Sequence, residues 1–218
     1  MKKIALLFIF GLSISFAQAQ AKFGIKAGLN YSNLSGDLTT EEVNQSKVGF
    51  VGGIVANFPL SSDNFVSIQP ELLYSQKGYQ YRDDEVQIGT YNYRFKGKRN
   101  FNYLDLPVLV KINAGPIFFE GGPQASYLLG IRDNREVENL DTGNDNKEWA
   151  KIEKDDLSEL EIGYVAGLGF QAPMGIGIGL RYNGSINALA KENSDELVNS
   201  RHSVFQLQLT YMLGGSGQ

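Results

Sequence analysis

Hydrophobic and polar residues alternate one by one along most of the chain beyond residue 20, and a period of two is that of β-strands. In the first such stretch, Phe23, Ile25 and Ala27 alternate with Gly24 and Lys26. A later stretch, 48–58, is rich in glycine and is the least regular. The pattern as a whole predicts eight strands, near residues 22–31, 48–58, 66–75, 103–112, 117–129, 162–171, 176–183 and 205–211.

The links between these predicted strands are short and long in turn. Three links, at 59–64, 113–116 and 172–175, are tight and contain the proline, glycine and asparagine residues of turns. The other links, 33–47, 80–99, 131–160 and 187–201, are long, polar and charged. This alternation is typical of a membrane barrel with turns on one rim and surface loops on the other. We therefore predict an all-β fold, an eight-stranded antiparallel up-and-down transmembrane β-barrel.

Alternation alone does not say which face of the barrel meets water. A soluble, lipocalin-like barrel that binds a small apolar ligand would turn its apolar phase inward, whereas a membrane barrel turns it outward. The outward arrangement is favoured because the polar phase carries little charge, most charge lies in the long links, and aromatic residues lie near the strand ends. The aromatic residues expected at the membrane interfaces are Phe23, Tyr31, Tyr74, Tyr127, Tyr164, Phe170, Tyr182 and Tyr211.

A small set of charged residues remains in the polar phase of the strands. It consists of three basic and three acidic residues: Lys26, Glu71, Asp105, Lys111, Glu120 and Arg181. An eight-stranded barrel is only wide enough for its own side chains to fill, and charges buried there need partners. We predict a structural salt-bridge network that closes the lumen, with a proton or ion relay as the functional alternative. The small diameter excludes a wide pore.

The first 19 residues have the pattern of a secretory signal peptide. Lys2 and Lys3 precede an apolar run, and Ala17-Gln18-Ala19 is a small-residue cleavage pattern. Cleavage before Gln20 would leave residues 20–218 as the barrel domain. A membrane anchor would need about 20 apolar residues, which is more than this run contains.

Composition excludes several kinds of site. The 218 residues include no cysteine and one histidine, so disulfides, thiolate sites and multi-histidine metal sites are excluded, and we expect no metal and no cofactor. A net charge of -4 argues against nucleic acid as a partner. The segment from Tyr79 to Phe101 mixes aromatic and basic residues. We interpret it as strand extensions above the bilayer, with the bases near lipid phosphates or anionic polysaccharide.

Three further segments contain residues of the kinds found in functional sites. His202 and Ser203 lie at the long-loop rim, where a hydrolase or acyltransferase site is one interpretation, but no nucleophile motif such as G-x-S-x-G is present and an exposed rim histidine is preferred. Glycine-rich 175–179 continues into a strand, so it is no phosphate loop. The acidic segment 131–160 lacks calcium-loop spacing, so we interpret it as a solvated loop, with weak divalent-cation binding as the alternative. Its Trp149 either anchors a partner or glycan or packs beneath the loop.

Four segments carry a family resemblance when they are taken together in order. They are FGIKAGLNYSNLSGD at 23–37, QPELLYSQKG at 69–78, YLDLPVLVK at 103–111 and GYVAGLGF at 163–170. From about residue 22 to 213 the chain resembles the PorT-like outer-membrane β-barrel proteins of Bacteroidota. The namesake is linked to a protein-secretion apparatus, but no motif carries that role over residue by residue. Barrels of this kind commonly end on an aromatic residue, whereas this chain continues past Tyr211 to Gln218.

The resemblance implies location and architecture more than activity. It implies a non-enzymatic barrel in the outer membrane, with both termini in the periplasm and four loops outside. We expect a monomeric membrane scaffold or surface-interaction protein. The expected partners are outer-membrane lipid and lipopolysaccharide, the barrel-assembly machinery during insertion, and a protein or glycan at the loops.

Overall fold

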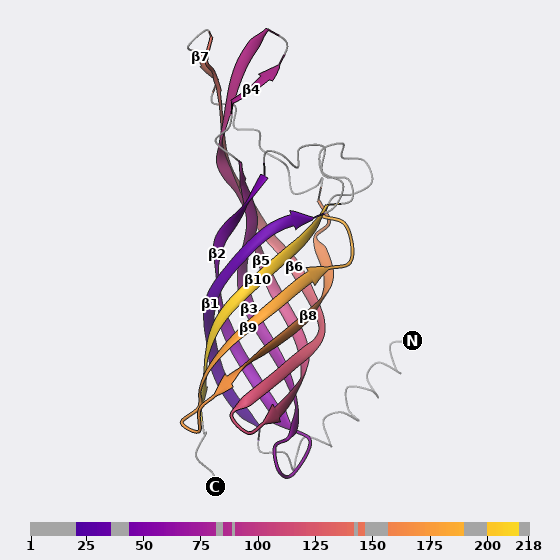
Figure 1. Ribbon diagram of the computed structural model, residues 1–218. Coiled ribbons are helices and arrows are strands. Elements are labelled where there is room, and N and C mark those ends of the chain that lie inside the picture. The colour runs from indigo at the N-terminus through magenta and orange to yellow at the C-terminus, as the bar shows by residue number, and fades with distance from the viewer. Residues whose placement is uncertain are drawn as a thin grey trace, which may run out of the picture.

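The protein folds into a tall antiparallel β-barrel, shown in Figure 1. The computed structural model describes residues 21–35, 44–81, 85–88, 90–141, 144–146, 157–189 and 200–213. The predicted signal peptide at 1–19 and the tail at 214–218 lie outside these residues. The strands are β1 (Lys22–Ser35), β2 (Asn44–Pro59), β3 (Val66–Tyr81), β4 (Glu85–Ile88), β5 (Tyr91–Ala114), β6 (Ile117–Asn139), β7 (Asn144–Asn146), β8 (Leu160–Gln171), β9 (Ile176–Ser185) and β10 (Arg201–Leu213).

Eight of these strands form the closed wall, which confirms the predicted eight-stranded antiparallel barrel. Their order around the wall is β5-β3-β2-β1-β10-β9-β8-β6, and pairing of β5 with β6 completes the circle. The first and last strands pair antiparallel, with Ile25 opposite Tyr211. The three predicted tight turns join β2 to β3, β5 to β6 and β8 to β9. We call this end of the barrel the turn rim and the opposite end the loop rim.

Two strands of the wall continue well beyond the loop rim. β5 has 24 residues and β6 has 23, and they pair from Ala114 and Ile117 at the turn rim to Tyr93 and Asn139 at the far end. The short strands β4 and β7 flank this extension, as Figure 1 shows at the top of the molecule. We call the four-stranded extension, β4 and β7 with residues 91–98 and 132–139, the blade.

The blade corrects part of the prediction for the long links. Residues 131–139 are strand and not a solvated loop, because their backbone groups pair with β5 although their side chains are mostly charged. Strand formation outside the wall therefore follows the continuing hydrogen-bond ladder rather than an apolar phase. The strand extension expected from the alternation at Tyr91–Phe95 is confirmed.

The barrel is apolar outside and charged inside. Leu106, Leu180 and Leu207 are 46%, 59% and 45% exposed, whereas Glu71 and Arg181 are each 3% exposed. The burial of β1 alternates residue by residue in the same sense. A soluble barrel with a dry apolar centre requires the reverse, so the lipocalin-like alternative is wrong. No helix in the described part of the chain is long and apolar enough to cross a membrane.

A small hydrophobic core closes the loop-rim end of the interior. It consists of Leu34, Tyr79, Phe101, Tyr103, Leu128, Leu157 and Leu189. Leu157 and Leu189 come from links between strands and are 1% and 2% exposed. The loop-rim end of the interior is therefore richer in apolar side chains than the middle, although buried Arg99 donates to the Tyr79 hydroxyl within it.

Candidate functional site: the charged lumen and its rims

Four of the predicted lumen charges form one compact group in the middle of the barrel, which we call the central cluster. Arg181 donates to both oxygens of Glu71, from Nη1 to Oε2 at 2.8 Å and from Nη2 to Oε1 at 2.7 Å. It also donates to Glu120, through Nε to Oε1 and through Nη2 to Oε2 at 3.0 Å. Lys26 Nζ lies 2.6 Å from Glu71 Oε1. Two cations thus face two carboxylates, and the guanidinium makes the paired bonds that its planar shape favours.

Neighbouring amides and one glycine complete the central cluster. Gln69 donates to Glu71 Oε1 at 2.7 Å, and Gln208 donates to Glu120 Oε1 at 2.8 Å. Gly167 leaves the space that Arg181 occupies, because a Cβ there would lie 2.8 Å from Arg181 Cγ. Since these carboxylates are buried, each extra donor offsets part of the cost of removing them from water.

Asp105 belongs to a second group nearer the loop rim, which we call the loop-side cluster. Lys77 Nζ lies 3.3 Å from Asp105 Oδ1 and 3.1 Å from Glu161 Oε1. His202 Nδ1 lies 2.7 Å from Glu161 Oε2. The predicted set omitted Lys77, Glu161 and His202. Lys77 is in phase with Glu71, and Glu161 precedes the predicted sixth strand by one residue. Extending the predicted strands 66–75 and 162–171 by one or two residues would therefore include Lys77 and Glu161.

His202 corrects a prediction. The sequence favoured an exposed rim histidine, but the side chain is 2% exposed. Its ring packs edge-on against Phe101 and Tyr103, with ring centroids 5.3 and 5.6 Å away. Its Nε2 has no hydrogen-bond partner among the described residues, so no hydroxyl there is placed as a nucleophile. The carboxylate needed to orient a catalytic histidine is present, but in a buried cluster rather than an open site.

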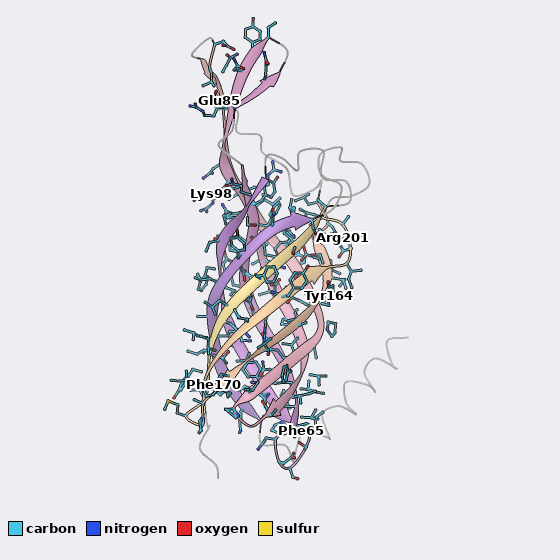
Figure 2. The ribbon with its side chains drawn as sticks, viewed as in Figure 1. Phe65, Glu85, Lys98, Tyr164, Phe170 and Arg201 are labelled. Atoms are coloured by element: carbon cyan, nitrogen blue, oxygen red, sulfur yellow. The ribbon has the colours of Figure 1, made fainter. Side chains whose placement is uncertain are left out.

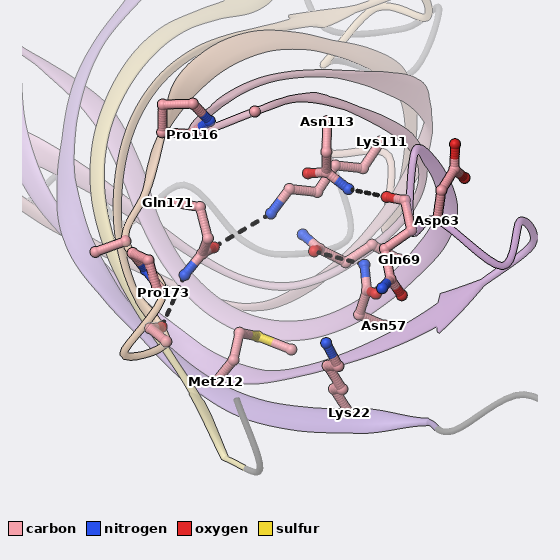
Figure 3. Close-up of a pocket in the computed structure, with 14 residues that line it drawn as sticks. Lys22, Asn57, Asp63, Gln69, Lys111, Asn113, Pro116, Gln171, Pro173 and Met212 are labelled. Atoms are coloured by element: carbon pink, nitrogen blue, oxygen red, sulfur yellow. Dashed lines mark hydrogen bonds between the residues drawn. The ribbon is translucent and has the colours of Figure 1, made fainter. Parts of the chain in front are cut away.

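Lys111 is opposite Glu120 in the β5–β6 ladder, but its ammonium lies toward the turn rim and outside both clusters. It is 6% exposed, its ammonium lies 4.0 Å from the centre of the Phe118 ring, and it donates to Gln171 Oε1 at 3.4 Å. No carboxylate in the described part of the chain forms an ion pair with it. Figure 3 shows it at the edge of a pocket of about 480 Å³ that opens at the turn rim. The six predicted charges therefore do not form one network. Four of them make up the central cluster, Asp105 belongs to the loop-side cluster, and Lys111 lies in neither.

The predicted interface aromatics fall into two groups along the barrel. Phe23, Phe170 and Tyr211 lie toward the turn rim, and Tyr31, Tyr74, Tyr127, Tyr164 and Tyr182 lie toward the loop rim. Figure 2 labels one of each group, Phe170 and Tyr164. Seven are 39% exposed or more, and Tyr182 is half-buried between Tyr164 and Phe205.

The remaining candidates give no site among the described residues. Residues 176–179 lie in β9, where a phosphate loop would need a helix. Asp141 of the acidic segment accepts a hydrogen bond from the Asn92 amide at 2.6 Å. No group of three or more histidine or acidic side chains in the described ranges is arranged to hold a metal ion. Trp149 lies outside those ranges.

A closed barrel with apolar side chains outside and paired charges inside defines a membrane-spanning β-barrel. The chain belongs to the family described as outer membrane protein beta-barrel domain, whose model matches residues 16–191. The protein is therefore an outer-membrane β-barrel. No curated protein matches the chain.

Several solved outer-membrane barrels are similar to this chain. The attachment invasion locus protein Ail of Yersinia pestis is 12% identical, with a TM-score of 0.45, and the match covers 88% of this chain and 99% of Ail. Neisserial surface protein A is 14% identical, with a TM-score of 0.46 and coverage of 88% and 97%. The translocator domain of the autotransporter NalP from Neisseria meningitidis is 9% identical, with a TM-score of 0.33 and coverage of 96% and 95%.

Proposed function

We propose that this protein is a non-enzymatic surface-interaction protein of the outer membrane, with the blade as its contact surface. The observation that carries the proposal is that two strands of the wall extend beyond the loop rim and carry two further strands with them. A sheet of this kind holds side chains at fixed positions away from the lipid. A partner at the blade is a protein or a glycan, and the protein works as a monomer.

The blade has local contacts that hold its shape. Arg94 Nη2 lies 2.5 Å from Glu85 Oε1, which ties β5 to β4. Asp141 accepts from the Asn92 amide at 2.6 Å, and the Leu140 amide donates to the Asn92 carbonyl at 2.9 Å. Tyr91 remains 47% exposed. An exposed tyrosine on a rigid support is a favourable contact residue, since little side-chain entropy is lost when it binds.

The paired charges support a structural role for the lumen. Both clusters combine cations with carboxylates at hydrogen-bond distance, and the hydrophobic core lies above them. A proton relay would need a chain of exchangeable groups open to both rims, whereas the loop-rim end of the interior contains the apolar side chains of Leu128, Leu157 and Leu189. We therefore favour closure of the barrel over transport.

The proposed orientation places the turn rim in the periplasm and the blade outside the cell. Short turns on the inner side and long connections on the outer side are the rule for these barrels. The proposal includes the signal peptide at 1–19, insertion by the barrel-assembly machinery, and interface positions for the two groups of aromatic residues. Membership of the PorT-like group, with its link to secretion, stays a proposal that rests on the four resembling segments.

The cysteine-free sequence allows a direct test of orientation. Gln87 lies on the blade and Ser62 in a tight turn, and both are exposed. In intact cells a membrane-impermeant maleimide should label Gln87→Cys and leave Ser62→Cys unlabelled until the cells are broken. Labelling of Ser62→Cys but not of Gln87→Cys in intact cells would show that the orientation is the opposite of the one proposed.

The interaction itself is tested with a photo-crosslinking amino acid at the same two positions. We expect partner-specific crosslinks from position 87 in intact cells, with position 62 as the matched control. Because Glu85 pairs with Arg94 and Val137 pairs with Asn146, removing 85–94 and 137–146 rejoins the chain at neighbouring points. This shortened protein should lose capture of the partner identified by crosslinking. Equal capture with and without these two segments would overturn the proposal.

A further inference from the structure

We propose that the pocket inside the turn-rim end of the barrel binds the carboxylate of a small organic acid, with the Lys111 ammonium as its counter-ion. The pocket has a volume of about 480 Å³, which is typical of sites for small ligands, and Figure 3 shows it from the turn rim. It lies at the opposite end of the molecule from the blade. The inference therefore goes beyond the proposed function and does not depend on it.

The first argument is the charge balance of the lumen next to the pocket. The central cluster is neutral by itself, since it has two cations and two carboxylates: Lys26, Arg181, Glu71 and Glu120. Lys111 is opposite Glu120 in the ladder, but the Glu120 carboxylate is bound by Arg181. Lys111 therefore adds a surplus positive charge, and a lysine as buried as this one is seldom found without an anionic partner.

The second argument is that the Lys111 ammonium has unused hydrogen-bonding capacity. An ammonium has three N–H donors. One reaches Gln171 Oε1 at 3.4 Å, which is longer than a usual hydrogen bond, and the centre of the Phe118 ring lies 4.0 Å from the nitrogen. The described residues provide no other partner for this ammonium, which points into the opening in Figure 3. An anion in the pocket would accept from the remaining N–H.

The third argument concerns the charge of the ligand. Lys22 and Asp63 also line the pocket, and their opposite charges cancel, so the excess charge of the pocket is the single charge of Lys111. The side-chain amides of the lining already donate to oxygen atoms of the protein: Asn57 to Ser67, Gln69 to Glu71, Asn113 to Asn64 and Gln171 to Gly175. One excess charge with few free neutral donors matches a carboxylate better than a phosphate, which carries more charge and more acceptor oxygens.

The rest of the lining indicates the uncharged part of the ligand and its way in. Gln69 lines the pocket and donates to Glu71, so the central cluster closes the pocket on its inner side. A ligand therefore enters from the turn rim. Pro116, Pro173 and the mostly buried Met212 give the pocket apolar walls. An acid that has an apolar body would reach Lys111 with its carboxylate and contact these walls with the rest.

The test measures binding of p-trifluoromethylbenzoate to the full-length protein in uncharged detergent micelles by fluorine NMR. We expect Lys111→Met to weaken binding about tenfold, because the loss of one charge-assisted hydrogen bond has an effect of this size. Lys98→Met removes an exposed lysine at the base of the blade and is the matched control, which should bind as the unaltered protein does. Heat-modifiable migration on gels shows that each variant has folded.

Further arms test the chemistry of the ligand without a variant. The uncharged p-trifluoromethylbenzamide should bind the unaltered protein about as weakly as the benzoate binds Lys111→Met, and excess inorganic phosphate should not displace the benzoate. Equal binding of acid and amide, displacement by phosphate, or equal binding by the two lysine variants would overturn the proposal. Displacement by a tripeptide with a free C-terminal carboxylate, but not by its amidated form, would overturn the assignment to a small acid and favour a polypeptide end. Because this assay does not involve the blade, its result is independent of the crosslinking result.

Discussion

Arg181 is the residue on which the central cluster depends. It is 3% exposed and donates to both Glu71 and Glu120. Replacing it with methionine would leave two buried carboxylates with Lys26 as their remaining cation. We expect Arg181→Met to lower the free energy of unfolding by about 3–5 kcal/mol, the usual cost of removing one partner from a buried ion pair. Urea unfolding in detergent micelles measures this change.

Arg201 provides the matched control for that substitution. It is an exposed arginine at the start of β10, near the loop rim in Figure 2. Arg201→Met should change the free energy of unfolding by less than about 0.5 kcal/mol, as substitutions of surface residues usually do. Similar losses for the two variants would show that the lumen charges do not hold the barrel together.

Gly167 lies where the lumen has no room for a larger side chain. A methyl group there would lie 2.8 Å from both Arg181 Cγ and the Leu180 carbonyl oxygen, and the backbone oxygen has little freedom to move. We expect Gly167→Ala to cost about 1–3 kcal/mol of stability, as overpacking does. Gly130→Ala, where the methyl group meets nothing within 4 Å, should cost less than that in the same unfolding experiment. Equal costs would contradict a tightly filled lumen.

The lumen residues show which contacts the sequence pattern predicts and which it does not. The period of two was sufficient to place Lys26, Glu71, Glu120 and Arg181 in one phase, and all four meet in the central cluster. It could not say which charges lie at the same height, because strand stagger decides that, so Asp105 pairs with Lys77 instead. His202 looked exposed because its strand begins at the rim, whereas Phe101 and Tyr103 from β5 cover it.

At the scale of the element, the described strands attach the blade to the wall through β5 and β6. Its other pairings, β4 with β5 and β6 with β7, are internal to it. We therefore expect removal of 85–94 and 137–146 to change the free energy of unfolding of the barrel by less than about 1 kcal/mol, because local units can open without the core. The unfolding midpoint in urea, compared with that of Arg181→Met, checks this expectation. A loss as large as that of the arginine variant would make the blade part of the stabilising core.

The strands also differ in how visible they are in the sequence. β1, β3, β8 and β9 cross the apolar zone, and their alternation located them. The outer part of β5 shows alternation only at Tyr91–Phe95, and the outer part of β6, with β4 and β7, has no regular alternation of apolar and polar residues. These segments are strands because their backbones pair with one another, and the alternation of apolar and polar residues does not predict such pairing.

At the scale of the whole molecule, the filled interior has a measurable consequence. Charge pairs occupy the middle of the barrel, and Leu128 and Leu157 belong to the hydrophobic core at its loop-rim end. In planar bilayers the purified protein should give no stepwise conductance at a concentration at which a porin does. Regular current steps would mean that the lumen opens, and they would favour the ion-relay alternative.

The seam between β1 and β10 has a consequence for how the molecule is made. The first strand of the wall pairs along almost its whole length with the last, from Phe23 opposite Leu213 to Ser35 opposite Arg201. Until the ribosome has released that final strand, β1 and β9 each present a row of bare amides and carbonyls that hydrocarbon cannot solvate. A nascent chain therefore cannot enter the bilayer strand by strand as it is synthesised, and it must be kept soluble in transit until both ends are available to meet.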